Sequence, residues 1–164
     1  MDALEAMRTR RSVRTLEPVE IPREHLEAIV DAGRLAPSGR NAQPWEFIVI
    51  TERETIARLA AVQGLVGQAS AVVTIVADEK GSRYWLEDAS AAAENMLLAI
   101  HALGYGSRWI EGTLLPKEAQ AKEVLGVPVE KRLVIMLPIG KPVYPDEPKQ
   151  KKPLDEVLHW ERYG

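Results

Sequence analysis

Basic and hydroxyl side chains near the N-terminus are suited to binding a phosphate. They occur in the run Arg10-Arg11-Ser12-Val13-Arg14, at the end of a predicted helix. Alternate side chains of an extended segment point the same way, so Arg10, Ser12 and Arg14 can converge on one ligand. Guanidinium groups match phosphate geometry and can bind it bidentately. Taken alone, however, the run is better explained as a solvated basic helix end that complements the helix dipole.

The connection at residues 37–45 is a second candidate for ligand contact. Nine residues are somewhat more than a helix needs to reach the following strand. The side chains of Ser38, Asn41 and Gln43 can hydrogen-bond the edges of a ligand, and the Pro-Trp pair that ends the segment supplies a rigid apolar wall. The alternative is an ordinary connection that ends in a core tryptophan.

A third candidate is the run Trp109-Ile110-Glu111-Gly112, which follows the longest predicted helix. A backbone N–H at Gly112 has no Cβ beside it and could approach a flat ring closely. On this fragment alone, a strand end followed by a turn is the more ordinary interpretation.

The charge distribution favours a small anion over a polyanion. The net charge is −3, whereas binding to nucleic acid requires a basic field. Basic residues nevertheless gather in two compact clusters, one at residues 8–14 and the other comprising Lys149, Lys151 and Lys152. We therefore predict a small anionic ligand and no nucleic-acid partner.

Several other site types and locations are excluded by composition. With no cysteine, the chain has no thiolate nucleophile, disulfide or cysteine-based zinc site. Its three histidines lack metal-ligand spacing, so we predict no metal site. No run of 18 apolar residues exists to span a membrane, and the N-terminus lacks the features of a secretory signal. We therefore predict a cytoplasmic protein with no membrane partner.

The periodicity of apolar residues predicts a single domain over 1–164. The apolar strand at 71–77 is expected to be covered on both faces, and the longest helix to lie in the core. Adjacent helical positions do not face each other, so Glu87 and Asp88 are interpreted as a surface or interface pair. The order of elements alone suggests an α/β fold. Helices are predicted at 2–11, 22–36, 53–61, 85–103 and 116–125, and strands at 47–50, 71–77, 107–110 and 133–137.

The C-terminal part, 138–164, is predicted to be an extended arm. Its repeated prolines argue against a helix or a central strand. The arm ends in apolar residues that require burial, which is most simply explained if it lies across a second subunit. The alternative is a tail folded back on its own domain. The prolines are Pro138, Pro142, Pro145, Pro148 and Pro153, and the apolar residues are Leu154, Val157, Leu158, Trp160 and Tyr163.

In order and spacing, these motifs together resemble the nitroreductase family of flavoproteins. The resemblance covers nearly the whole chain, including Asp88, Asn95 and Met96 of the central helix and the closing run at 151–155. It implies an α+β fold with a mostly antiparallel sheet flanked by helices. It further implies a homodimer that exchanges C-terminal arms and binds FMN at the interface, with NADH or NADPH as co-substrate.

The resemblance also implies roles for individual residues. Arg10 and Ser12 would bind the phosphate and ribityl end, and Arg14 would approach the N1/O2 edge of the ring. The 37–43 loop would reach the FMN held mainly by the partner subunit, and Glu111 would lie near N5. The complete set of cofactor-binding residues is Arg10, Arg11, Ser12, Arg14, Pro37, Ser38, Gly39, Asn41, Gln43, Ile110, Glu111, Gly112, Lys151 and Lys152.

The implied activity is FMN-dependent reduction of nitroaromatic, quinone or flavin-type acceptors with hydride from NADH or NADPH. The cofactor carries this chemistry, so we predict no catalytic acid or base among the side chains. Two alternatives stay open. One is another flavin-dependent reduction on the same scaffold, such as dehalogenation or enone reduction, and the other is a flavin-binding module without turnover.

Overall fold

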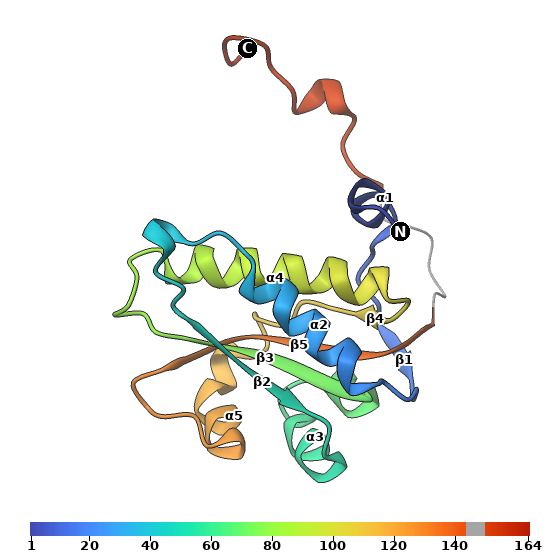
Figure 1. Ribbon diagram of the computed structural model, residues 1–164, viewed down its shortest axis with the longest axis vertical. Helices are drawn as coiled ribbons and strands as arrows, with labels where there is room; N and C mark the ends of the chain where they lie inside the picture. The colour runs from blue at the N-terminus through green and yellow to red at the C-terminus, as the bar shows by residue number, and fades with distance from the viewer. Residues whose placement is uncertain (144–149) are drawn as a thin grey trace.

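The computed structural model describes residues 1–143 and 150–164 and has an α+β fold. Every strand pair among these residues is antiparallel, and helices cover both faces of the sheet (Figure 1). The fold class implied by the family resemblance is confirmed, whereas the α/β fold suggested by element order is wrong. The helices are α1 Ala3–Thr9, α2 Arg23–Arg34, α3 Arg53–Leu59, α4 Trp85–Ala102 and α5 Glu118–Leu125, and the strands are β1 Thr15–Glu17, β2 Trp45–Ile50, β3 Ala71–Ala77, β4 Gly106–Ser107 and β5 Arg132–Val143. Short 3-10 turns are η1 Gly39–Asn41, η2 Gly64–Gln68, η3 Leu115–Lys117 and η4 Leu154–Glu156.

The sheet separates two hydrophobic cores. Its strand order is β1-β5-β3-β2, with β4 paired to β5. All seven residues of β3 are buried, as predicted, and their side chains alternate between the two faces. Val73 and Ile75 pack toward α2 and α4, whereas Val72 and Val76 pack toward α3 and α5. The sheet therefore holds α4 in a fixed position on one face.

Strand β2 is an edge strand and not the buried strand predicted at 47–50. It pairs only with β3, so its other edge has no neighbour among the described residues. Val49 is accordingly 40% exposed. The apolar composition of the segment does not reveal this position, since an edge and a central strand can share the same residue types.

Strand β5 continues through Pro138 and Pro142, so the prediction that these prolines exclude a central strand is wrong. The Met136 N–H donates to Ile110 O, and successive N–H groups along a strand alternate between its edges. The nitrogens of Pro138 and Pro142 therefore face the same edge as that of Met136, away from β3. Neither proline removes a bond from the β3–β5 ladder.

The C-terminal segment lies apart from the sheet. Residues 138–143 belong to β5, while the predicted positions Pro145, Pro148 and Lys149 lie outside the described residues. Every residue from 150 to 164 is exposed, and the segment extends away from the sheet in Figure 1. It does not fold back onto its own domain, which was the alternative to crossing a second subunit.

Helix α1 begins and helix α4 ends as their sequences predict. Asp2 caps α1 by accepting a hydrogen bond from Glu5 N at 2.9 Å, and Gly104 follows α4 with a φ of 87°. The apolar face of α1 is not part of the core, because Leu4 and Met7 are both more than half exposed. No helix in the described part of the chain has the length and apolar character to cross a bilayer.

Candidate functional site

The side chains of the basic segment at residues 10–14 alternate in exposure about a buried Val13. Val13 is buried, and its N–H donates to Ser107 O at 2.9 Å, which anchors the segment beside β4. Ser12 and Arg14 are exposed on either side of Val13. Within the described ranges, no side-chain hydrogen bond or ion pair engages Ser12 or Arg14. Their polar groups are therefore oriented away from the core.

Arg10 has a buried donor atom with no hydrogen bond. Its Nε lies 3.3 Å from Glu94 Oε1 on α4, an ion pair without hydrogen-bonding geometry. The same Nε is buried and has no hydrogen-bond partner among the residues described. A buried donor left unpaired costs free energy. An anion bound at this position would supply the missing acceptor.

Helix α4 also contacts the last residue of α1, immediately before the basic segment. Thr9 Oγ1 lies 2.7 Å from Glu5 O, to which it donates, and 2.8 Å from His101 Nε2. Since a hydroxyl has one proton, Thr9 accepts from His101, which fixes the Nε2–H tautomer. Burial lowers the pKa of His101, and the charges of Arg10 and Arg11 lower it further. His101 is therefore a neutral hydrogen-bond donor at the end of α1.

The run at 109–112 follows β4, the strand whose Ser107 accepts the hydrogen bond from Val13 of the basic segment. Ile110 is buried and forms a backbone bridge with Met136. Glu111 Oε2 accepts from Trp109 Nε1 at 3.2 Å, so this carboxylate is oriented by its neighbour. Gly112 is exposed, and a Cβ built on it would meet no atom within 4 Å. The space beside Gly112 is open to a ligand.

The loop at residues 37–43 lies toward the other end of α4. Its Gly39 N–H donates to Asp88 in the first turn of that helix, whereas Arg10 faces Glu94. Six residues of helix separate the two attachment points by about 9 Å along the axis. No hydrogen bond or ion pair recorded for residues 1–143 and 150–164 joins this loop to the basic segment. Within one chain, the two predicted parts of the site are therefore apart.

Lys151 and Lys152 are not brought to the basic segment either. Both are exposed at the start of the described arm. None of the hydrogen bonds or ion pairs of the described residues links them to residues 10–14.

The sequence analysis missed the buried position of Asp88. It is only 4% exposed and accepts two hydrogen bonds, so the prediction of a surface or interface pair is wrong for this residue. Its neighbour Glu87 is exposed, as expected of that pair. The available signal was helical spacing, because Asp88 is one turn from Ala92 on the apolar side of α4. A carboxylate on a buried stripe needs hydrogen-bond donors.

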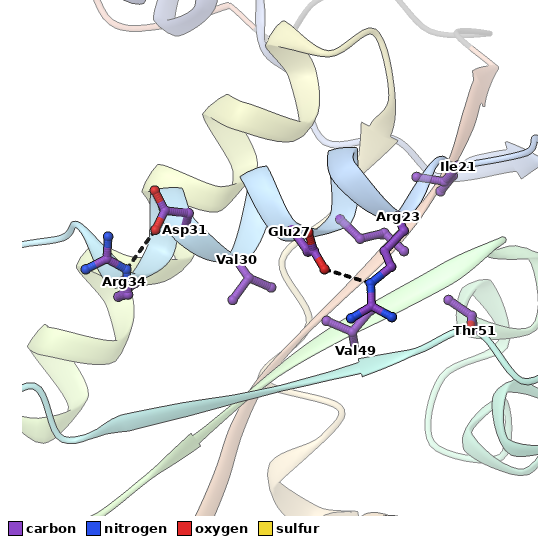
Figure 2. Close-up of a pocket in the computed structure, with 9 residues that line it drawn as sticks. Ile21, Arg23, Glu27, Val30, Asp31, Arg34, Val49 and Thr51 are labelled. Atoms are coloured by element: carbon purple, nitrogen blue, oxygen red, sulfur yellow. Dashed lines mark hydrogen bonds and ion pairs between the residues drawn. The ribbon is translucent and has the colours of Figure 1, made fainter.

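A groove of about 650 Å³ between α2 and β2 was also missed (Figure 2). Ile21, Leu26, Val30 and Val49 contribute its apolar lining. The ion pairs Arg23–Glu27 and Arg34–Asp31 lie along α2 beside it. The sequence contains no strong signal for this groove, because it exists only where α2 crosses the open edge of β2. None of the predicted cofactor-binding residues lines it.

Comparison with known proteins places this architecture in a family. The model of the nitroreductase family matches residues 7–64 and 60–141. The chain belongs to the nitroreductase family. A relative from Archaeoglobus fulgidus, provisionally named an NADH dehydrogenase/NAD(P)H nitroreductase, is 35% identical over 171 residues, covering 98% of this chain and 95% of the relative.

Solved structures of nitroreductases have the same fold. An FMN-dependent nitroreductase from Clostridium difficile superposes with a TM-score of 0.84 at 29% identity, over 98% of this chain and 99% of that one. A nitroreductase-like protein from Desulfovibrio desulfuricans, solved in complex with FMN, gives 0.86 at 30% identity, over 100% and 99% of the two chains. The family prediction made from the ordered motifs is thus confirmed. No group of metal-ligating side chains is present among the described residues of this chain.

Proposed function

We propose that this chain is the protomer of a homodimeric, FMN-dependent oxidoreductase that takes hydride from NADH or NADPH. The acceptors we propose are nitroaromatics, quinones or free flavins. Family membership supports the reaction class, and the names of the relatives support both the cofactor and the reductant.

The observation that carries the proposal is the buried Nε donor of Arg10, which makes no hydrogen bond among the described residues. The exposed side chains of Ser12 and Arg14 lie on the same segment. Two guanidiniums and a hydroxyl form a donor set that matches a phosphate dianion. The open space beside Gly112 can accept a planar ring. These residues therefore fit FMN in both charge and shape.

The separation of the two halves of the site within one chain supports the proposed homodimer. The basic segment is attached to the second half of α4 and the 37–43 loop to its beginning. If two α4 helices pack antiparallel about a two-fold axis, the loop of one protomer comes to the basic segment of the other. The exposed Leu4 and Met7 on α1, with Leu35 after α2, supply apolar surface for such an interface.

We further propose that the arm of one protomer occupies the α2–β2 groove of its partner. The arm exposes Trp160 to 76% and Leu154 to 71%, and none of the residues that the structure describes covers them. The groove has an apolar lining beside the unpaired edge of β2, where an extended segment can add main-chain hydrogen bonds. Among the described residues of one protomer, neither the arm nor the groove is covered. In a dimer, the arm of each protomer can cover the groove of the other.

When bound, FMN supplies the chemistry, accepting a hydride equivalent from the nicotinamide and passing electrons to the acceptor. The chain binds and orients it. Arg10, Ser12 and the lysines at 151 and 152 would hold the phosphate. Arg14 would place positive charge beside the ring and favour its more negative state. Ser12, Arg14 and Gly112 are exposed, which would leave room for the reductant and then the acceptor to bind beside the ring.

The test begins with the purified protein. We expect it to be yellow, to release FMN on denaturation, and to bleach when NADH or NADPH is added without oxygen. A colourless protein that also ignores added FMN would refute the proposal. A yellow protein that neither reductant bleaches would be a flavin-binding module. Offering nitroaromatics, quinones, haloaromatics and enones to the reduced protein then identifies the acceptor class.

A further inference from the structure

We propose that Asp88 is a positioning residue that fixes the 37–43 loop in the conformation presented to the flavin of the partner subunit. The identity of the ligand rests on the proposed function, whereas the attachment of the loop to Asp88 rests on the structure. Asp88 itself lies beneath the loop and is not exposed to a ligand.

The loop has an unusual backbone. Arg40, Asn41 and Gln43 have φ angles of 55°, 58° and 48°, in the left-handed region that costs free energy for residues with a Cβ. None of the three is a glycine, so the conformation persists only if its surroundings over-determine it. Backbone strain of this kind requires an anchor.

Part of the restraint comes from within the loop. Ser38 Oγ accepts from Gln43 N at 3.1 Å, and Asn41 N donates to Ser38 O at 3.0 Å. These bonds define the shape of the turn, but they do not connect it to the rest of the protein. They therefore cannot set the direction in which Ser38 and Asn41 face.

Asp88 makes the connection to α4. Its Oδ1 accepts from Gly39 N at 2.8 Å, and its Oδ2 accepts from Ser82 Oγ at 2.9 Å. Ser82 Oγ in turn accepts from Tyr84 N at 3.0 Å, so one carboxylate joins the loop to the turn that begins α4. An ionised carboxylate has an acceptor oxygen for each donor, and the N-terminal turn of a helix favours its negative charge.

Close packing makes this anchor specific. A Cβ built on Gly39 would lie 2.4 Å from Tyr84 Cδ2, so the loop backbone rests directly against this ring. Tyr84 immediately precedes α4, the same helix that holds Arg10 through Glu94. The helix therefore sets the positions of both the phosphate-binding segment and the loop that reaches the partner's site.

The experiment compares Asp88→Ala, Asp88→Asn and Glu87→Ala in the full chain. The first readout is amide hydrogen exchange at Gly39 without FMN, and the second is the dissociation constant for FMN. Removal of one charge-assisted hydrogen bond should raise Gly39 exchange and weaken FMN binding in Asp88→Ala, each by about tenfold. Asp88→Asn should stay within about threefold of the wild type, because its amide can still accept from Gly39 and hydrogen-bond Ser82.

Glu87→Ala is the matched control, an adjacent but exposed carboxylate, and should behave as the wild type. Unchanged Gly39 exchange or unchanged FMN affinity in Asp88→Ala overturns the proposal. An Asp88→Asn variant whose Gly39 exchange and FMN affinity equal those of Asp88→Ala also overturns it. If Asp88→Ala does not fold, Ser82→Ala should raise Gly39 exchange to a smaller extent, and no rise overturns the proposal. A wild-type chain that binds no FMN refutes the proposed function, while Gly39 exchange still decides whether Asp88 anchors the loop.

Discussion

At the scale of single residues, the guanidinium of Arg10 is half-buried and faces Glu94 without forming a hydrogen bond to it. A pair of this kind neutralises charge but leaves donor capacity for a further acceptor. Asp88, by contrast, has a hydrogen bond to each carboxylate oxygen. The first environment suits ligand binding and the second suits support of the backbone.

Replacing Arg10 with alanine tests the phosphate site. The variant should lose at least one charge-assisted hydrogen bond and weaken FMN binding by about 1.5–3 kcal/mol, roughly 10- to 150-fold. Fluorescence quenching on titration with FMN measures the change. Arg58→Ala on α3, across the sheet, is the control and should bind FMN like the wild type. Equal affinities in all three proteins would show that the basic segment does not bind the phosphate.

At the scale of elements, short strands and helix ends position the site. Strand β4 has only two residues, yet Gly106 lies between Val13 of the basic segment and Pro142 of β5. A Cβ built on Gly106 would lie 2.7 Å from Pro142 Cβ and 3.0 Å from Val13 Cγ2. The absence of a side chain at this position allows the basic segment to dock against the sheet.

Gly106→Ala should therefore destabilise the protein by about 1–3 kcal/mol through overpacking. It should also weaken FMN binding, because Val13 must move. Urea unfolding gives the first quantity and FMN titration the second. Gly64→Ala is the control, since its Cβ would meet nothing within 4 Å. A Gly106→Ala variant as stable as this control would contradict the packing argument.

An ion pair joins α5 to the start of β5. Glu118 accepts hydrogen bonds from Arg132 and from Leu133 N, the latter at 2.9 Å. Burial acts to raise the pKa of Glu118, but the hydrogen bonds and the positive charge of Arg132 outweigh it, so the pKa is lowered. Its contribution to stability is therefore present above the unfolded-state pKa, near 4.5, and is lost as pH falls through the lower folded value.

Glu118→Gln should lower the free energy of unfolding by about 1 kcal/mol at pH 7. The difference from the wild type should shrink as the pH falls below the ordinary range of a glutamate pKa. Urea unfolding at several pH values measures this trend, with the exposed Glu123→Gln on the same helix as the control. A difference that stays constant down to pH 3 would show that the charge of Glu118 is not its source.

At the scale of the whole molecule, apolar surface is exposed at both ends of the chain. Leu4 and Met7 of α1 and the large apolar side chains at 154–163 are all exposed in one protomer. Exposed apolar surface of this extent marks an interaction site. The proposed dimer would bury both regions, and the arm would cover the open edge of β2.

Substituting Leu158→Ser and Trp160→Ser together should weaken the dimer by about 3 kcal/mol or more, at least a hundredfold in its dissociation constant. Val49→Glu in the groove should act in the same direction. Sedimentation over a range of concentrations measures both variants. Arg162→Ser, a polar change in the same arm, should leave the dimer intact. An unchanged dimer dissociation constant in the first two variants would rule out the α2–β2 groove as the binding site of the arm.

Local chemistry in the sequence was enough to predict much of this protein. Continuous apolar residues predicted β3, the periodicity of apolar residues predicted α4 and α5, and five ordered motifs predicted the family. The alternation about Val13 also followed from the run at 10–14, because an extended segment has a two-residue period. These features depend on neighbours in the chain, and the sequence records neighbours directly.

Only the tertiary structure decided the features that depend on what lies across the fold. Pro138 could be accommodated in a central strand because its nitrogen faces away from β3, and Val49 is exposed because no described strand pairs with the outer edge of β2. Asp88 was predicted to belong to a surface or interface pair, whereas its donors Gly39 and Ser82 come from separate turns that the fold brings to it. Burial and hydrogen-bond partnership arise between segments distant in sequence, so residue type and spacing alone do not specify them.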